Sequence, residues 1–202
     1  MPKSENLFQD ITLLLGLIGV IKALIEYRKA QSWKKAEFLA KEMKEFFADK
    51  NVQRALLILD WNVIDITLFE HEADNKTKFR FIDSMLERSL KHHEEAIFSE
   101  EEAIIRQIMD NFLFKLGMFQ NYIDSKLISK KDIEPYLQYW IELIGKSKDG
   151  KKDEHIINQL WVFINYYGYN SVIKLVENFG YTIAIETRTP TSINAKPTNY
   201  GV

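Results

Sequence analysis

The residues with the most potential for chemistry form an acidic cluster with two histidines near the middle of the chain. His92 and His93 precede Glu94 and Glu95, and Glu100–Glu102 follow shortly afterwards. Metal-binding helices usually place ligands three or four residues apart, as in HExxH or ExxH, and neither pattern occurs in this sequence. Adjacent side chains on a helix point about 100° apart, so His92 and His93 cannot both face one ion without a bend. We therefore expect a solvated helix end with histidines favoured by the helix dipole.

A second acidic stretch could bind a divalent ion through oxygen atoms. It contains Glu70, His71, Glu72 and Asp74. The EF-hand spacing is absent, and so is the glycine that an EF-hand requires at its sixth position. The segment 145–153 fails the same test. Both stretches are expected to be exposed polar loops, and no metal ligand is assigned to either.

Recognisable catalytic motifs are missing as well. The chain has no G-x-S-x-G elbow, no P-loop and no dinucleotide fingerprint. It has no cysteine, which excludes disulfides, thiolate zinc sites and a cysteine nucleophile. We therefore expect no catalytic or cofactor-binding residues, no cofactor and no small-molecule substrate. An enzyme with an unrecognised site would need a pocket that joins Asp83, Glu87 and a histidine.

Helical patterns dominate the elements that would position these residues. Ser99 and Glu102 form a capping box, which predicts the start of the longest helix of the soluble part. Gly117 interrupts that helix at a cost of about 1 kcal/mol, which predicts close packing there. Together with the other amphipathic segments, this indicates an all-α fold with a bundle of about six helices.

Two segments depart from the helical pattern. Ile64, Ile66 and Leu68 alternate with polar residues, as in a short strand, whereas the periodicity from about Lys76 to His93 predicts a helix. Residues 181–186 could form one more short strand. The tail after them is rich in Thr, Pro and Asn, which predicts disorder.

The most apolar run extends from Ile11 to Ile25, and we interpret it as a transmembrane helix that continues into an amphipathic helix. Over residues 8–26 such a helix is about 28 Å long, enough for a typical hydrocarbon core. The uncharged centre between Asp10 and Lys22 has only eleven residues, so a buried core helix and an interfacial helix remain alternatives. The expected membrane-anchor residues are Ile11, Leu14, Leu15, Leu17, Ile18, Val20 and Ile21.

A basic segment follows the apolar run and predicts the orientation of the chain. Its residues are Lys22, Arg28, Lys29, Lys34 and Lys35. The positive-inside rule places the N-terminus outside and the domain in the cytoplasm, at the inner membrane, in a single-pass topology. The expected organisation is an anchor, a cytoplasmic helical domain and a flexible tail, over residues 1–30, 31–180 and 181–202.

The charge distribution argues against nucleic acid as a partner. The chain has a formal net charge of −2, and residues 65–102 carry eleven acidic and five basic side chains. Residues 22–50 carry eight basic and five acidic side chains. Anionic lipid would attract the basic segment, whereas the acidic one would repel phosphate backbones.

Several short runs together resemble a group of bacterial proteins. They are Trp33–Phe38, Phe46–Asp49, Ala55–Asn62 (ALLILDWN), Phe81–Asp83 and Tyr136–Trp140 (YLQYW). The likeness covers most of residues 8–180 and is to uncharacterised proteins with one N-terminal membrane helix and a small cytoplasmic helical domain of unknown function. The resemblance implies this architecture, and it implies no activity, cofactor or catalytic residue.

Two consecutive helices carry more aromatic residues than one helix face can bury. Trp140 and Trp161 lie on apolar stripes and are expected in the core, whereas Tyr139 and Tyr166 lie off those stripes. Tyr and Trp dominate the energetics of protein interfaces, so Tyr139 and Tyr166 are candidates for a partner surface. Core packing with the hydroxyl groups in water is the alternative.

The sequence reveals no biochemical activity. It favours a membrane-tethered interaction or scaffold protein, whose partners are the lipid bilayer and another protein or a second copy. A small membrane-perturbing effector, toxin-like or active in phage defence, is the alternative, because Gly16, Gly19 and Lys22 could serve helix association in the bilayer. An enzyme with an unrecognised carboxylate or histidine site is the second alternative.

Overall fold

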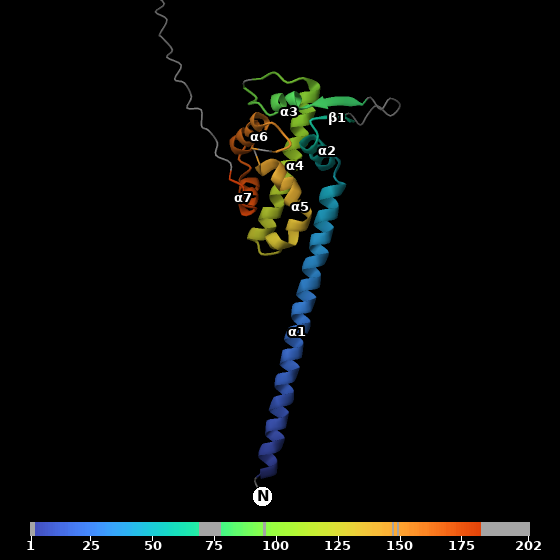
Figure 1. Ribbon diagram of the computed structural model, residues 1–202. Coiled ribbons are helices and arrows are strands. Elements are labelled where there is room, and N and C mark those ends of the chain that lie inside the picture. Colours follow the sequence, from blue (N-terminus) through green and yellow to red (C-terminus); the bar gives the residue numbers. More distant parts are fainter. Residues whose placement is uncertain (1–2, 69–77, 95, 147, 149, 183–202) are drawn as a thin grey trace, which may run out of the picture.

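A computed structural model describes residues 3–68, 78–94, 96–146, 148 and 150–182, with side chains from Leu13 onward. This part of the chain forms seven helices and one two-stranded sheet. One long helix projects from a group of shorter helices, as Figure 1 shows. The predicted helical fold is confirmed in its main features, with a small sheet added. The predicted tail and its strand lie outside the described residues, apart from Tyr181 and Thr182, which form no strand.

Helix α1 (Lys3–Ala48) joins the apolar run and the amphipathic segment into one rod, as predicted. After Gly19 it contains neither glycine nor proline, so its hydrogen-bond ladder has no built-in break. Asp49 separates it from α2 (Lys50–Asp60). The Asp49 carboxylate accepts hydrogen bonds of 2.9 and 3.0 Å from two amides of the first turn of α2, which is the geometry of an N-cap.

An antiparallel hairpin follows α2. Strand β1 (Val63–Ile66) pairs with β2 (Phe79–Ile82), with Val63 opposite Ile82 and Ile64 opposite Phe81. Phe81 is fully buried, whereas Val63 and Ile82 are exposed on the opposite face. The alternation predicted at Ile64 and Ile66 is therefore confirmed as a strand.

The helix predicted from about Lys76 to His93 is wrong at both ends. Its first part is strand β2, and α3 covers only Asp83–Ser89. The pattern misleads because Phe79 and Phe81 are two residues apart and face the core together from a strand. Pairing with β1 overrides the helical periodicity that the downstream apolar residues suggest.

Helix α4 (Glu100–Asp124) is the centre of the domain. It begins at the predicted capping box: the Ser99 hydroxyl accepts from the Glu102 amide at 3.2 Å, and the Glu102 carboxylate accepts from the Ser99 amide at 3.0 Å. A Cβ atom at Gly117 would lie 3.2 Å from Cβ of Ser171, so the close packing expected at this glycine is confirmed.

Three further helices complete the domain, namely α5 (Lys130–Gly145), α6 (Glu154–Tyr166) and α7 (Asn170–Asn178). Helix α7 packs on α4, whereas α5 packs on α2 and α7, and α6 packs on α3 and α7. Trp161 is 3% exposed, and its indole Nε1 donates a hydrogen bond of 2.8 Å to the carbonyl oxygen of Ile144. The core position predicted for Trp161 is confirmed. Trp140 is only partly buried and packs at the margin of the core.

Candidate functional site

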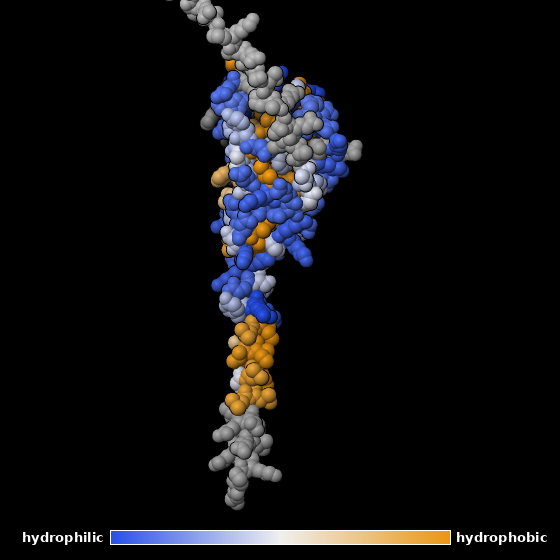
Figure 2. Space-filling model, turned by 90° about the vertical axis from the view of Figure 1, so that its left-hand side faces the viewer, coloured by the Kyte–Doolittle hydropathy of each residue, from blue (hydrophilic) through white to orange (hydrophobic). Residues whose placement is uncertain are grey.

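The N-terminal part of α1 presents apolar side chains in several directions. We call residues 13–34 the arm, because every one of them is exposed. Leu13, Leu14 and Leu15 point about 100° apart around the helix, and they are 73, 58 and 63% exposed. The large apolar side chains that follow are each at least 49% exposed, namely Leu17, Ile18, Val20, Ile21, Leu24 and Ile25. Figure 2 shows them within an orange band outside the hydrophilic domain. Of the predicted anchor residues, only the side chain of Ile11 lies outside the described part.

A basic and aromatic segment separates this apolar band from the domain. Residues 27–36 contain four basic side chains and no acidic one. Tyr27 and Trp33 are 62 and 78% exposed. Aromatic rings and cations in this order are typical of the flanks of membrane-inserted helices.

Among the residues whose structure is described, no helix is long and apolar enough to cross a membrane, so the predicted transmembrane span is not supported. The physical reason is the charge spacing. Only eleven uncharged residues lie between Asp10 and Lys22, and Glu26, Arg28 and Lys29 follow within the seven residues after Lys22. Lys22 and Glu26 form a surface ion pair of 3.9 Å one turn apart. A span requires about 20 predominantly apolar residues.

Polar contacts fasten the second half of α1 to the domain. Lys35 Nζ pairs with the Asp132 carboxylate at the start of α5, at 2.5 Å. The Tyr122 hydroxyl on α4 donates a hydrogen bond of 2.7 Å to the Glu42 carboxylate. Burial, together with the Glu42 carboxylate, raises the pKa of Tyr122 to about 12, so this hydroxyl stays protonated at neutral pH.

Apolar contacts hold the same half of α1. Phe46 is 4% exposed, and its ring lies 5.2 Å from that of Phe119, edge to face. Phe38 meets the ring of Tyr122 at 5.1 Å in the same way. The arm therefore leaves the domain in a fixed direction, set by α4 and α5.

The predicted partner residue Tyr139 belongs to a charged cluster at the end of α2. Its hydroxyl and Lys151 Nζ both donate to the Asp60 carboxylate, and Lys151 Nζ also donates to the Tyr139 hydroxyl at 2.5 Å. Burial would raise the pKa of Asp60, but the hydrogen bonds from Lys151 and Tyr139 outweigh it and lower that pKa. This cluster ties the α5–α6 loop to α2.

Lys152 forms a buried ion pair beside that cluster. Its ammonium group donates to the Asp83 carboxylate and, at 2.7 Å, to the carbonyl oxygen of Trp61, with 1% of its side chain exposed. The same nitrogen lies 5.5 Å from the centre of the Phe81 ring. Burial lowers the pKa of Lys152 and raises that of Asp83, and each charge is retained through the other.

The structure places Asp83 and Glu87 on one helix, yet each carboxylate already has a partner. Lys152 holds Asp83, and Glu87 lies 3.6 Å from the imidazole of His155. In the described residues no group of three or more potential ligands could hold a metal ion. The acidic stretch 70–74 lies outside the described residues.

The histidine pair departs from the sequence prediction. Helix α3 ends at Ser89, so His92 and His93 follow it in a turn, and their ring centroids are 4.4 Å apart. The argument from helical spacing therefore does not apply to them. His93 Nδ1 lies 2.9 Å from the Tyr167 hydroxyl, and the His92 ring packs edge to face on Tyr166 at 4.0 Å.

Tyr139 and Tyr166 are exposed as predicted, at 41 and 56%. Tyr139 contacts the charged end of α2, whereas Tyr166 contacts His92. Within the described part of the chain no ring contact or hydrogen bond joins the two tyrosines, so they do not form one continuous aromatic patch. Their role as a partner surface stays a prediction.

Sequence reasoning missed the polar residues that position the elements. The run GKSKDGKKD reads as an exposed loop, although Lys152 within it is buried. A lysine in a polar loop carries no signal of burial, because its partner Asp83 lies 69 residues away. The contact between Glu42 and Tyr122 has no local signal either, since it joins residues 80 positions apart.

Comparison with known proteins adds no family assignment. The resemblance to bacterial proteins with one membrane helix therefore stays a prediction. No protein family, curated protein or solved structure matches this chain significantly.

Proposed function

We propose that this protein is a membrane-tethered interaction module, whose α1 arm inserts into a lipid bilayer and holds the helical domain beside it. The observation that carries the proposal is the exposure of nine large apolar side chains between Leu13 and Ile25. Fully burying one such side chain is worth roughly 1.5–3 kcal/mol, so nine that are about half exposed represent on the order of 10 kcal/mol. That is comparable to the whole stability of a typical domain, and such a surface requires an apolar cover.

A bilayer fits this surface better than a partner helix does. A coiled coil buries one narrow stripe of each helix and leaves polar residues on the others. Here Leu13, Leu14 and Leu15 point in three directions and are all apolar. The segment from Leu13 to Ile25 is about 20 Å long at 1.5 Å per residue, which reaches through most of a hydrocarbon core of about 30 Å.

The residues that flank the apolar band also favour a lipid bilayer as its surroundings. Tyr27 would sit at head-group level, and Arg28 and Lys29 would meet lipid phosphates. The excess of basic residues on this side favours a cytoplasmic domain at the inner membrane. Asp83 and Glu87, the carboxylates that could have served an enzyme, are engaged in ion pairs with Lys152 and His155, which favours binding over catalysis as the role of the domain.

The tether is tested by fractionation of the full-length protein. We expect it to remain with membranes after a carbonate wash, and the double substitution Leu15→Glu/Ile18→Glu to release it. The matched control is Ile97→Glu/Val162→Glu, which adds the same charge at two exposed apolar positions of the domain. Full-length protein that is soluble without detergent, or release by the control pair alone, contradicts the proposal.

A reporter fusion tests the orientation. With the basic flank on the cytoplasmic side, a C-terminal fluorescent protein that matures only in the cytoplasm should emit, and a C-terminal alkaline phosphatase should stay inactive. The opposite pair of results would place the domain on the other side of the membrane.

A further inference from the structure

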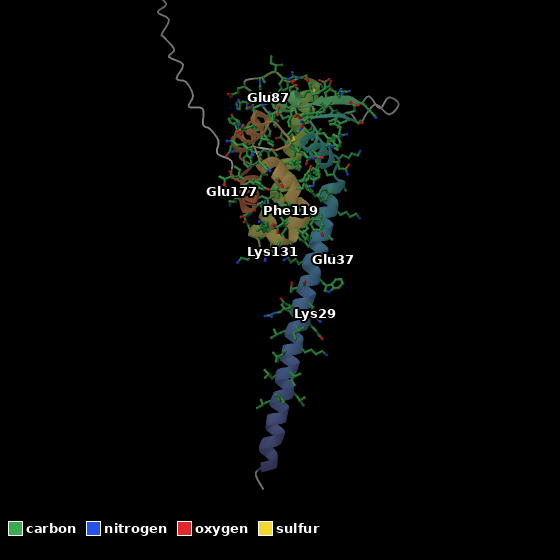
Figure 3. All side chains as sticks on the ribbon, in the orientation of Figure 1. Lys29, Glu37, Glu87, Phe119, Lys131 and Glu177 are labelled. Carbon is green, nitrogen blue, oxygen red and sulfur yellow. The ribbon has the colours of Figure 1, made fainter. Side chains whose placement is uncertain are left out.

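The end of the domain that faces the arm is formed by the turn between α4 and α5. Figures 1 and 3 show this turn, beside the labelled Lys131, on the side of the domain toward the N-terminus of α1. The ion pair between Lys35 and Asp132 fixes the start of α5 beside α1 at that level. Whatever covers the arm therefore lies on the same side of the domain as this turn.

The turn carries an excess of positive charge, although Lys130 pairs with Glu134 and Lys35 of the α1 flank pairs with Asp132. Residues 125–131, SKLISKK, contain three lysines and no acidic residue, and residues 27–36 contain four basic residues and no acidic one. The whole chain has 27 basic and 29 acidic side chains, so the remainder has 20 basic and 29 acidic, a net charge of −9. An anionic surface would attract this end of the molecule and repel the rest.

Two of the lysines have no ionic partner in the described part of the chain, namely Lys126 and Lys131. Lys130 is shared between Glu134, at 3.5 Å, and the face of the Phe179 ring, at 4.9 Å. These ammonium groups are therefore accessible to an external anion.

The turn also presents an apolar side chain in a fixed position. Its backbone is closed by hydrogen bonds of 2.9 and 3.0 Å from the amides of Lys126 and Leu127 to α4 carbonyls. Ile128 is buried at 3% exposure, whereas Leu127 is turned outward and is 51% exposed. A leucine between lysines is the arrangement that inserts between lipid head groups while the ammonium groups stay at the phosphates.

The distances allow contact with a bilayer that holds the arm. From Ile25, the last residue of the apolar band, to Lys35 the helix rises about 15 Å. The polar region of one leaflet is about 5–8 Å thick, and the Debye length at physiological ionic strength is about 8 Å. With an upright arm the turn thus lies about one Debye length beyond the head groups, close enough for its lysines to be attracted, and a tilt of the arm toward the turn, of the order of 20° that helices in bilayers show, brings the turn into contact.

We propose that the α4–α5 turn is a second membrane-contact site, in which Lys126, Lys130 and Lys131 bind the phosphates of anionic lipids and Leu127 inserts between the head groups. This inference rests on the proposed membrane tether, because the arm sets the position of the turn. The site selects for anionic lipid, whereas the arm inserts into lipid of either charge.

The test uses the absence of native cysteines. Full-length Leu127→Cys, labelled with an environment-sensitive fluorophore, is reconstituted into vesicles of phosphatidylcholine alone or with about 30% phosphatidylglycerol. We expect a blue-shifted emission only with the anionic lipid, and its loss near 1 M salt, where the Debye length is about 3 Å. The same label on Ile97→Cys, which is fully exposed on the domain, should not respond.

Charge reversal identifies the lysines. One lysine near an anionic surface contributes about fivefold in affinity, so Lys126→Glu/Lys131→Glu should abolish the blue shift of the Leu127 label. The control Lys91→Glu/Lys148→Glu changes net charge equally on segments that do not belong to the turn and should preserve it. Circular dichroism verifies that both variants are folded.

The outcomes separate the two proposals. Protein that floats with both kinds of vesicle while the Leu127 label reports water in each overturns the second contact site and leaves the tether standing. A shift that is equal in both lipids, or that the control pair removes as well, overturns the lysine site. Protein that floats with neither kind of vesicle overturns both proposals.

Discussion

Arg88 Nε donates a hydrogen bond of 2.5 Å to one carboxylate oxygen of Glu102, while the other oxygen of the same carboxylate accepts from the Ser99 amide. Glu102 is 7% exposed, so its charge is held by these two partners more than by water. One side chain thus caps α4 and joins it to the end of α3.

Because Glu102 has two partners, we expect substitutions of Ser99 and Glu102, the two residues of the capping box, to lower the free energy of unfolding by unequal amounts. Ser99→Ala should lower the free energy of unfolding by about 1 kcal/mol, because one amide loses its acceptor. Glu102→Ala should cost about 2 kcal/mol or more, since both the Ser99 amide and Arg88 lose theirs. Chemical denaturation measures both, with Glu100→Ala as the exposed control. Equal costs would show that the link to Arg88 contributes nothing.

Because Lys152 and Asp83 form a buried ion pair, we expect the effects of substituting them on the free energy of unfolding to be strongly coupled. Lys152→Met or Asp83→Asn alone should each cost about 3 kcal/mol, because each leaves a buried partner uncompensated. The double variant should cost clearly less than the sum of the two, which a double-mutant cycle measures. Additive costs would contradict the pairing.

The same pair predicts a pH dependence with a definite sign. Burial raises the pKa of Asp83, and removal of Lys152 raises it further. A carboxyl group with a raised folded-state pKa destabilises the fold progressively as pH rises above its unfolded value of about 4. The free energy of unfolding that Lys152→Met loses relative to the parent should therefore be smaller at pH 4 than at pH 7. A deficit that grows on acidification would reverse this assignment.

For Asp49 we expect stability to change with pH in the opposite direction. Burial acts to raise its pKa, but hydrogen bonds from Lys115, at 2.7 Å, and from the Val52 and Asn51 amides together lower it. Its contribution to stability is present above the unfolded pKa of about 4 and is lost as pH falls through the folded pKa. Asp49→Asn keeps the cap and removes the charge, so it should cost at most about 1 kcal/mol at pH 7. That cost should vanish in acid, as melting curves at both pH values can verify.

Trp161 and Tyr166 lie five residues apart on α6 and predict contrasting outcomes. Trp161→Ala should cost about 3–5 kcal/mol, because a buried ring and its hydrogen bond to Ile144 are lost. Tyr166→Ala removes a ring that is 56% exposed and should leave the domain folded. Thermal melts of the two variants, compared side by side, decide this. A collapse of Tyr166→Ala would mean that its packing on His92 supports the fold.

The sequence predicts those elements that follow from local patterns. The capping box at Ser99 and the strand at Ile64 need only nearby residues to be recognised, and the structure contains both. The periodicity predicts a helix where the second strand lies, because Phe79 and Phe81 acquire their strand conformation from pairing with residues some 15 positions away.

The candidate site likewise has one part that local sequence reveals and one part that it does not. The exposed apolar arm is a local property of composition, and the sequence indicates it directly. The α4–α5 turn gains its relevance from the contact between Lys35 and Asp132, which are distant in the chain. No local pattern could place Lys126 and Lys131 on the same side of the molecule as the basic flank of α1.

The continuity of α1 gives the molecule the mechanics of a lever. From Leu13 to Lys35 the helix is about 33 Å long, and neither glycine nor proline provides a hinge after Gly19. A tilt of about 20°, the average for helices in bilayers, displaces Leu13 sideways by roughly 11 Å relative to Lys35. Because the second half of α1 is fastened to α4 and α5, the domain must turn through the same angle. With the arm in lipid, the orientation of the domain then follows the thickness of the bilayer.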